Sequence, residues 1–152
     1  MDFSVPLANQ VLVLSALSWA VAQFVKGLVI RIMTGRLTLE QFFASGGMPS
    51  SHSALVTCCA TTVGTLYGFD SGLFALAALF AMVVMYDACH VRLSSGEQAK
   101  VVNELLRSYH KDSPNELLQA ELKVVLGHTT LQVVMGAVLG LIIALVGMWL
   151  MD

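Results

Sequence analysis

The feature that most restricts the fold of this chain is a set of long segments without formal charge. Four of them lack Asp, Glu, Lys and Arg altogether, and they cover residues 4–25, 41–69, 71–86 and 124–151. A helix needs about 20 mostly apolar residues to cross a membrane. Because 57% of the 152 residues are hydrophobic and only 12% are charged, we expect an all-α, polytopic membrane bundle rather than a water-soluble domain.

The uncharged segments predict about four transmembrane helices within a single membrane-embedded domain, residues 1–152. The expected spans are 6–32, 50–69, 72–88 and 128–150. Between the last two spans lies the polar stretch 95–126, in which apolar residues recur at helical spacing opposite charged ones. We expect this stretch to form a cytoplasmic amphipathic helical segment, with a second short helix starting at the capping pattern of residues 113–116.

Lysine and arginine are confined to the connections between the first two and the last two spans, together with the adjoining helix ends. The positive-inside rule assigns such connections to the cytoplasm, so we expect both chain termini on the opposite side. The formal net charge is -2 and no basic patch stands out, which argues against nucleic acid as a partner. Three cysteines within apolar segments predict no disulfide framework.

One short segment at an expected membrane boundary carries the residue types needed for chemistry on an anion. Residues 46–53 read Gly-Gly-Met-Pro-Ser-Ser-His-Ser, and Pro49 suits the first turn of a helix. Unpaired N–H groups and the positive end of the helix dipole make such a helix start favourable for phosphate. The hydroxyls of Ser50 and Ser51 lie near these N–H groups, and His52 would stand beside the bound anion.

Alternating spans bring further polar residues to the same membrane face as His52. They are Lys26, Asp87, Arg92, Lys123 and His128. Two histidines surrounded by Lys26, Arg31, Arg92 and Lys123 suit phosphoryl transfer, because cations hold the phosphate oxygens while one imidazole attacks and the other donates a proton. Histidine fits both roles since its ordinary pKa is about 6.5. Asp87 could orient one of the two rings.

The same residues resemble a known family. Residues 46–54 are similar to the Pro-Ser-x-His motif of the type-2 phosphatidic acid phosphatase and vanadium haloperoxidase superfamily, in its short divergent membrane branch. Ordered matches continue at residues 86–88 with 91–92, at 96–99, and at 126–129. The resemblance implies that His52 is the leaving-group acid and His128 the nucleophile. It further implies that cationic side chains hold the phosphate and that neither a metal nor another cofactor is required.

The chain departs from the larger superfamily around the second histidine. The superfamily places an arginine shortly before that histidine and an aspartate four residues after it, where this chain has Lys123 and Gln132. The superfamily's first motif has a lysine and an arginine separated by six residues, whereas Lys26 and Arg31 lie five positions apart. A glutamine carries no charge to stabilise an imidazolium. Either Asp87 supplies the carboxylate, or His128 is a weaker nucleophile than its counterparts.

The leading hypothesis is a membrane phosphatase that hydrolyses a lipid phosphomonoester, such as phosphatidylglycerol phosphate or phosphatidic acid, through a phosphohistidine. The alternative is a catalytically inactive relative that binds anionic headgroups or acts as a membrane assembly partner. A metal site formed by His52, Asp87 and His128 lacks any short ligand spacing, and a transporter lacks a visible inverted repeat. Gly136 and Gly140 form a GxxxG pattern, which leaves a homodimer open.

Overall fold

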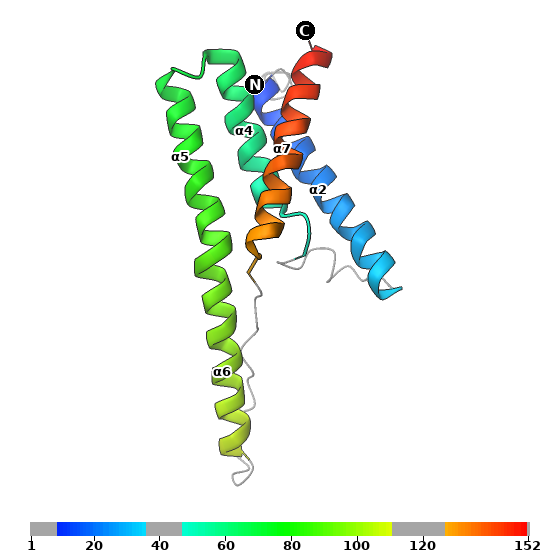
Figure 1. Ribbon diagram of the computed structural model, residues 1–152, viewed down its shortest axis with the longest axis vertical. Coiled ribbons are helices and arrows are strands. Elements are labelled where there is room, and N and C mark those ends of the chain that lie inside the picture. The colour runs from blue at the N-terminus through cyan, green and yellow to red at the C-terminus, as the bar shows by residue number, and fades with distance from the viewer. Residues whose placement is uncertain (1–8, 36–46, 111–126, 152) are drawn as a thin grey trace, which may run out of the picture.

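A computed structural model describes residues 9–35, 47–110 and 127–151, and all regular secondary structure in them is helical (Figure 1). The elements are α2 (Gln10–Thr34), α4 (Ser51–Tyr67), α5 (Gly72–Tyr86), the π-helix η1 (Asp87–Val91), α6 (Arg92–His110) and α7 (Thr130–Met151). The predicted all-α membrane bundle is confirmed. Lys123 and the short helix predicted at residues 113–116 lie outside the described residues.

Local sequence signals explain where these helices begin and end. The side chain of Asn9 accepts a hydrogen bond from the Leu12 N–H at 3.2 Å and so caps the start of α2. Gly35 ends this helix with a left-handed φ of 72°, which glycine adopts at little cost. The hydroxyl of Ser71 caps α5 in the same way, by accepting from the Phe74 N–H at 3.1 Å.

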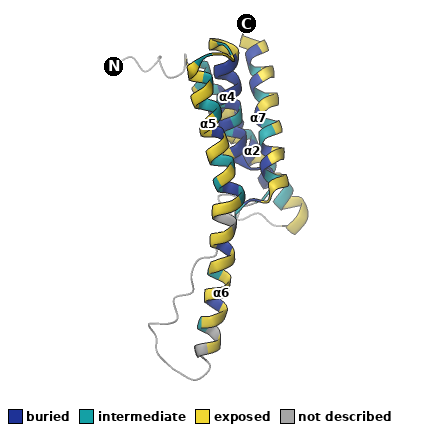
Figure 2. Ribbon diagram, turned by 60° about the vertical axis from the view of Figure 1, so that its left-hand side comes forward, coloured by how far each residue is buried: buried dark blue, intermediate teal, exposed yellow. Residues whose placement is uncertain are grey.

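Helix α4 lies at the centre of the bundle and packs against α2, α5 and α7, while α2 also packs against α7 (Figures 1 and 2). Most buried side chains of α4 are small, so neighbouring backbones can approach closely. On one side, Leu14 and Cys58 form an apolar cluster with two residues of α7. On the other side, Val56 and Ala60 pack against Ala81 of α5. The central helix therefore sets the distance between its neighbours.

Three helical segments are long and apolar enough to cross a membrane: Gln10–Thr34, Gly72–Leu106 and Thr130–Met151. They correspond to the first, third and fourth expected spans. The second expected span forms α4, which has 17 residues and so extends for roughly 26 Å at 1.5 Å per residue. This length falls short of a hydrocarbon core of about 30 Å. Most residues of α4 are buried within the bundle.

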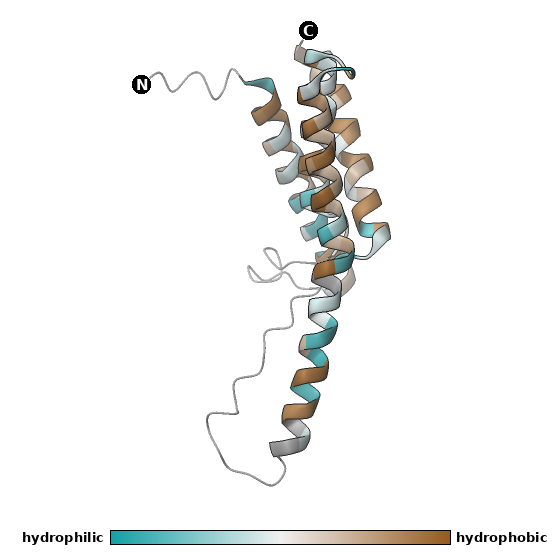
Figure 3. Ribbon diagram, turned by 90° about the vertical axis from the view of Figure 1, so that its left-hand side faces the viewer, coloured by the Kyte–Doolittle hydropathy of each residue, from teal (hydrophilic) through white to brown (hydrophobic). Residues whose placement is uncertain are grey.

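The polar helix α6 continues directly from α5 through η1, and the three form one long rod that projects beyond the bundle (Figures 1 and 3). The sequence predicts a span ending near residue 88 and a polar helical segment from residue 95. The structure joins the two, because no Pro or Gly interrupts residues 87–95 and the helix can proceed through a π-turn. The sequence changes from apolar in α5 to polar in α6, while the helix continues.

The GxxxG pattern of α7 is used within the chain. A Cβ added at Gly136 would meet the Ser50 carbonyl oxygen, and one added at Gly140 would meet the Ala54 carbonyl oxygen. Both glycines are buried against the first turns of α4. Their absent side chains therefore allow α7 to lie directly on the segment that carries His52, and this contact uses the helix face that a GxxxG dimer would need.

Gly140→Ala is expected to destabilise the fold by about 1–3 kcal/mol, because the new methyl group must displace the α4 backbone. The measurement is denaturant unfolding in detergent, followed by circular dichroism. Gly72→Ala is the matched control, since nothing lies within 4 Å of its added Cβ. If the motif instead joined two chains, Gly140→Ala would dissociate a dimer and leave the stability of the monomer unchanged.

Candidate functional site

Segments from four parts of the chain meet at the end of the bundle where α4 and α7 begin (Figure 1). The aliphatic stem of Lys26, from α2, lies against Gly47, whose added Cβ would be 3.4 Å from the lysine Cγ. The N–H of Ser50 donates to the Gln132 carbonyl at 3.0 Å, and the N–H of His128 donates to the Ala88 carbonyl, also at 3.0 Å. These two bonds join the starts of α4 and α7 to each other and to η1.

The start of α4 is a tightly capped helix N-terminus. Ser50 is fully buried, and its Oγ accepts from the Ser53 N–H at 3.3 Å and from the Ser53 Oγ–H at 3.0 Å. Ser51 is also buried, whereas His52 is exposed. Both serines predicted to bind phosphate thus lie at this end of the bundle, but the Ser50 oxygen already serves as the cap. An anion here would meet backbone N–H groups and the helix dipole.

His128 precedes α7 and is only 5% exposed. Its Nδ1 lies 3.2 Å from Gln132 Oε1, and the ring also forms a hydrogen bond with the backbone of Gly47. Burial lowers the pKa of His128 below its ordinary value, and the positive charges of His52 and Lys26 lower it further, against the two hydrogen bonds, which raise it. The lowered pKa favours the neutral imidazole near pH 7. The charges of α2 and α4 are therefore close enough to act on this ring.

The π-turn η1 supports His128 through its backbone. Ala88 is 4% exposed and its carbonyl accepts the His128 N–H. Asp87, the preceding residue, is half-buried. The rings of Tyr86 and His90 stack nearby, with centroids 4.5 Å apart. Isolated π-turns within helices are frequent at functional sites, and the predicted site residue Asp87 lies at the start of this one.

Gln132, which the sequence marks as a departure from the superfamily's aspartate without giving it a site role, lies beside His128. Its Oε1 accepts from the Thr129 N–H at 3.1 Å as well as facing His128, and its own N–H donates to Thr129 Oγ1 at 3.4 Å. The pair forms a capping box, and the Thr-x-x-Gln pattern that signals one is visible at residues 129–132. Gln132 thus lies beside the second imidazole and brings no negative charge to it.

The remaining predicted cations are less closely placed. Arg31 is exposed near the C-terminal end of α2. Arg92 begins α6, but its side chain is not among those described, and Lys123 lies outside the described residues. Among the described residues, no three His, Cys, Asp or Glu side chains could hold one metal ion. The structure therefore brings Lys26, His52, Ser50, Ser51 and His128 to one end of the bundle.

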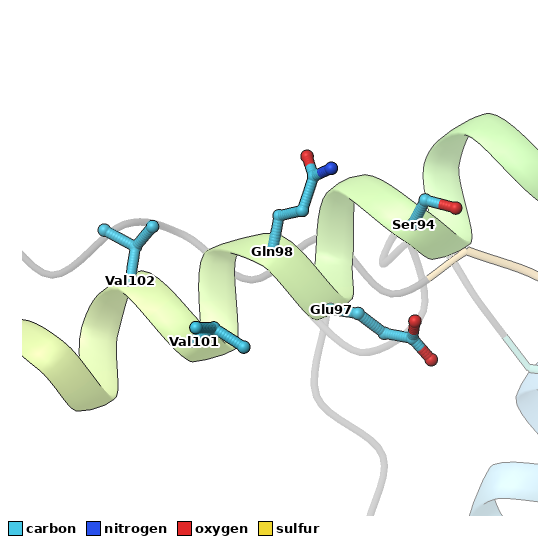
Figure 4. Close-up of a pocket in the computed structure, with 5 residues that line it drawn as sticks. All are labelled: Ser94, Glu97, Gln98, Val101 and Val102. Carbon is cyan, nitrogen blue, oxygen red and sulfur yellow. The ribbon is translucent and has the colours of Figure 1, made fainter.

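A pocket of about 360 Å³ lies elsewhere, along α6 (Figure 4). Its described lining residues are Ser94, Glu97, Gln98, Val101 and Val102. They include one carboxylate and no cation, so these side chains offer nothing to attract a phosphate.

Comparison with known proteins identifies the family of this chain. The model of the family described as "Divergent PAP2 family" matches residues 7–143, which include every site residue named above. The chain belongs to this family. It is 38% identical over 149 residues to the Uncharacterized membrane protein YuiD of Bacillus subtilis (strain 168), which covers 92% of this chain and 94% of that protein. No solved structure matches this family member. The relative is named a membrane protein, in agreement with the apolar helices found here.

Proposed function

We propose that this protein is a membrane phosphatase that hydrolyses a phosphomonoester on a lipid. The observation that carries the proposal is that His52 and Lys26 act electrostatically on the buried His128, next to the N-terminus of α4. Two imidazoles, an ammonium group and a helix start supply a nucleophile, a proton donor and anion ligands within one site. Membership of the divergent PAP2 family supports the same chemistry.

In the proposed reaction, the phosphate of the substrate binds at the start of α4 and is held by Lys26. The neutral His128 attacks phosphorus through the ring nitrogen that carries no proton, and the P–O bond to the lipid breaks as His52 donates a proton to the leaving oxygen. A phosphohistidine and a lipid alcohol result. His52, now neutral, accepts a proton from water, whose oxygen attacks phosphorus and releases inorganic phosphate from His128.

Other predicted site residues keep supporting roles in this proposal. Asp87 contributes a carboxylate at η1, beside the residue that holds the His128 backbone. Ser50 and Ser51 shape the helix start that receives the phosphate. Arg31, Arg92 and Lys123 stay predicted phosphate-binding residues on the strength of the sequence alone.

A lipid substrate is supported by the position of the site at the ends of apolar helices. The helices that flank the site are α2 and α7, and both are long enough to cross a bilayer. A substrate with its acyl chains in the membrane could therefore present its phosphate to His128. The distribution of Lys and Arg along the chain supports a cytoplasmic location of the site. Phosphatidylglycerol phosphate and phosphatidic acid both offer a terminal phosphomonoester on that side.

The test is phosphate release by the purified protein in detergent, measured with phosphatidylglycerol phosphate, phosphatidic acid and an isoprenoid diphosphate. We expect release from at least one phosphomonoester, and inhibition by vanadate, which mimics pentavalent phosphorus. Phosphate release that persists when His52 and His128 are both replaced by alanine would sink the proposed mechanism.

A second candidate function is binding of anionic lipid headgroups without turnover. The observation that favours it is the neutral Gln132 beside His128, because a carboxylate there would stabilise the imidazolium that forms during turnover. Three results together would support this function over the phosphatase. The protein would bind phosphatidic acid vesicles, release no phosphate, and give no trapped phosphohistidine after alkaline quenching.

Lys26→Met is expected to lower kcat/KM by roughly 10- to 100-fold, because a charged hydrogen bond to phosphate is lost. Methionine preserves the apolar stem that lies against Gly47. Since the Lys26 charge lowers the pKa of His128, its removal raises that pKa. As the solution is acidified, His128 is then protonated at a higher pH. The acid limb of the pH–rate profile therefore shifts to higher pH. Lys100→Met, on the exposed face of α6, is the control and should change neither quantity.

A further inference from the structure

Three buried side-chain atoms have no hydrogen-bond partner within the part of the chain that the structure describes, and all three belong to α2. They are Ser15 Oγ, Ser18 Oγ and Gln23 Oε1. A buried polar atom without a partner costs free energy, so each one requires an explanation. A serine hydroxyl carries its own proton and can turn towards a helix carbonyl of the preceding turn. An amide oxygen carries no proton and only accepts, so Gln23 Oε1 needs a donor that none of the described residues supplies.

Gln23 lies beside the proposed phosphate ligand on one face of α2. It precedes Lys26 by three residues, a spacing that places the two Cβ atoms about 5–6 Å apart. Both side chains are buried, with Gln23 6% and Lys26 4% exposed. The stem of Lys26 lies against Gly47, and its charge acts on His128. The unsatisfied acceptor is therefore about one helical turn from the group that holds phosphate in the proposed reaction.

The direction of α2 indicates which part of a lipid would meet Gln23. This helix is long and apolar enough to cross a membrane, and Lys26 lies nearer than Gln23 to its C-terminal end, on the side where α4 and α7 begin (Figure 1). Gln23 is thus about 4.5 Å further into the membrane along the helix axis. When a lipid phosphate binds Lys26, the lipid continues inward from there. The first groups along it are the carbon that bears the phosphate ester and the next carbon.

We propose that Gln23 selects a lipid phosphomonoester that carries a free hydroxyl on the carbon next to the phosphate-bearing carbon. This hydroxyl donates to Gln23 Oε1 while Lys26 holds the phosphate. The phosphate itself cannot satisfy the amide oxygen, because a phosphate dianion has acceptor oxygens and no proton to donate. The inference rests on the proposed phosphatase function and narrows its substrate class.

The hydroxyl separates lipids that otherwise present the same phosphate. Phosphatidylglycerol phosphate and lysophosphatidic acid both carry it. Phosphatidic acid has an acyl ester on the corresponding carbon, whose oxygens only accept, so its binding would leave Gln23 Oε1 buried and unsatisfied. A site that hydrogen-bonds a substrate hydroxyl discriminates against analogues that lack this group. We therefore expect the hydroxyl-bearing lipids to be the better substrates.

The simpler explanation is an ordered water molecule that donates to Gln23 Oε1. Buried water commonly satisfies polar groups of this kind. A water molecule that stays in place satisfies the amide with any substrate, so it predicts no preference for the hydroxyl. Two lipids that differ in this single group therefore distinguish the two explanations.

The test compares lysophosphatidic acid with its deoxy analogue, which has the same acyl chain and phosphate but lacks the hydroxyl. With the purified full chain in detergent, we expect kcat/KM for phosphate release to be about 10- to 100-fold higher for the hydroxyl form. Gln23→Leu should bring this ratio close to one, mainly by slowing the hydroxyl form. Lys26→Met should slow both lipids alike and preserve the ratio. Ser15→Ala, which removes another unpartnered oxygen of α2, should change neither rate.

A binding measurement separates this inference from the proposed function. Short-chain forms of the two lipids are titrated calorimetrically into His128→Asn, with and without Gln23→Leu. Suppose that the wild type releases no phosphate, while His128→Asn binds the hydroxyl form about 10- to 100-fold more tightly and loses this preference with Gln23→Leu. The phosphatase is then refuted and the role of Gln23 stands.

The inference is overturned if neither kcat/KM of the wild type nor the Kd of His128→Asn favours the hydroxyl form, as an ordered water would predict. It is also overturned if the preference persists in Gln23→Leu. Phosphate release without discrimination would refute the role of Gln23 and leave the phosphatase intact. The wild-type ratio requires no substitution at Gln23, and Gln23→Met, of similar length, replaces Gln23→Leu if circular dichroism shows that the leucine variant does not fold.

Discussion

His128→Asn is expected to reduce phosphate release by roughly 10³- to 10⁶-fold, the range seen when a nucleophile is removed from an enzyme. Asparagine places an amide N–H near the position of Nδ1, so it can still donate to Gln132 Oε1. It has no atom in place of Nε2. The substitution therefore removes the proposed nucleophilic ring while preserving the hydrogen bond to Gln132 and the backbone bond to Ala88.

The decisive measurement is trapping of the phosphoenzyme with ³²P-labelled substrate, followed by alkaline quenching, under which a phosphorus–nitrogen bond survives. Wild-type protein should retain label, and His128→Asn should retain none. His90→Asn is the control, because His90 is exposed and stacks only on Tyr86 among the described rings. Label that remains in His128→Asn would assign the nucleophile to another residue.

The fold was largely predictable because apolar helices in a membrane leave a strong signal. Uncharged segments located the helices within a few residues, as for α7, expected at 128–150 and found at Thr130–Met151. The continuity of α5 with α6 was not predictable from hydropathy, because polarity changes at Asp87 while helix propensity does not. The use of GxxxG within one chain was equally hidden, since the spacing of Gly136 and Gly140 permits both kinds of contact.

The sequence predicted where the proposed site residues lie but not the contacts between them. Alternation of spans places Lys26, His52 and His128 at one membrane face, and the structure has them at one end of the bundle; their roles stay predictions. Hydrogen bonds between distant segments could not be foreseen. The role of the Ala88 carbonyl depends on a π-turn that has no sequence signature, and the Gln132 contact depends on the rotamer selected by a capping box.

His52→Ala is expected to slow hydrolysis of a lipid phosphomonoester by roughly 10²- to 10⁴-fold, the usual contribution of a general acid or base. His52 is exposed at the start of α4, so its removal should leave the packing of the bundle unchanged. An alkoxide is a poor leaving group, and without a proton donor it departs slowly. An aryl phosphate such as p-nitrophenyl phosphate needs no proton for its departure, so the first step should be nearly restored with this substrate.

The second step distinguishes His52 from a residue that merely binds phosphate. Because water still needs a base to attack the phosphohistidine, His52→Ala should accumulate phosphoenzyme with the aryl substrate, above the wild-type level. Lys26→Met should not, since loss of a phosphate ligand weakens binding with both substrates alike. An equal loss of rate on lipid and aryl phosphates, without accumulation, would show that His52 acts as a ligand. With accumulation in His52→Ala and no label in His128→Asn, the two histidines would divide the reaction between acid–base and nucleophilic roles.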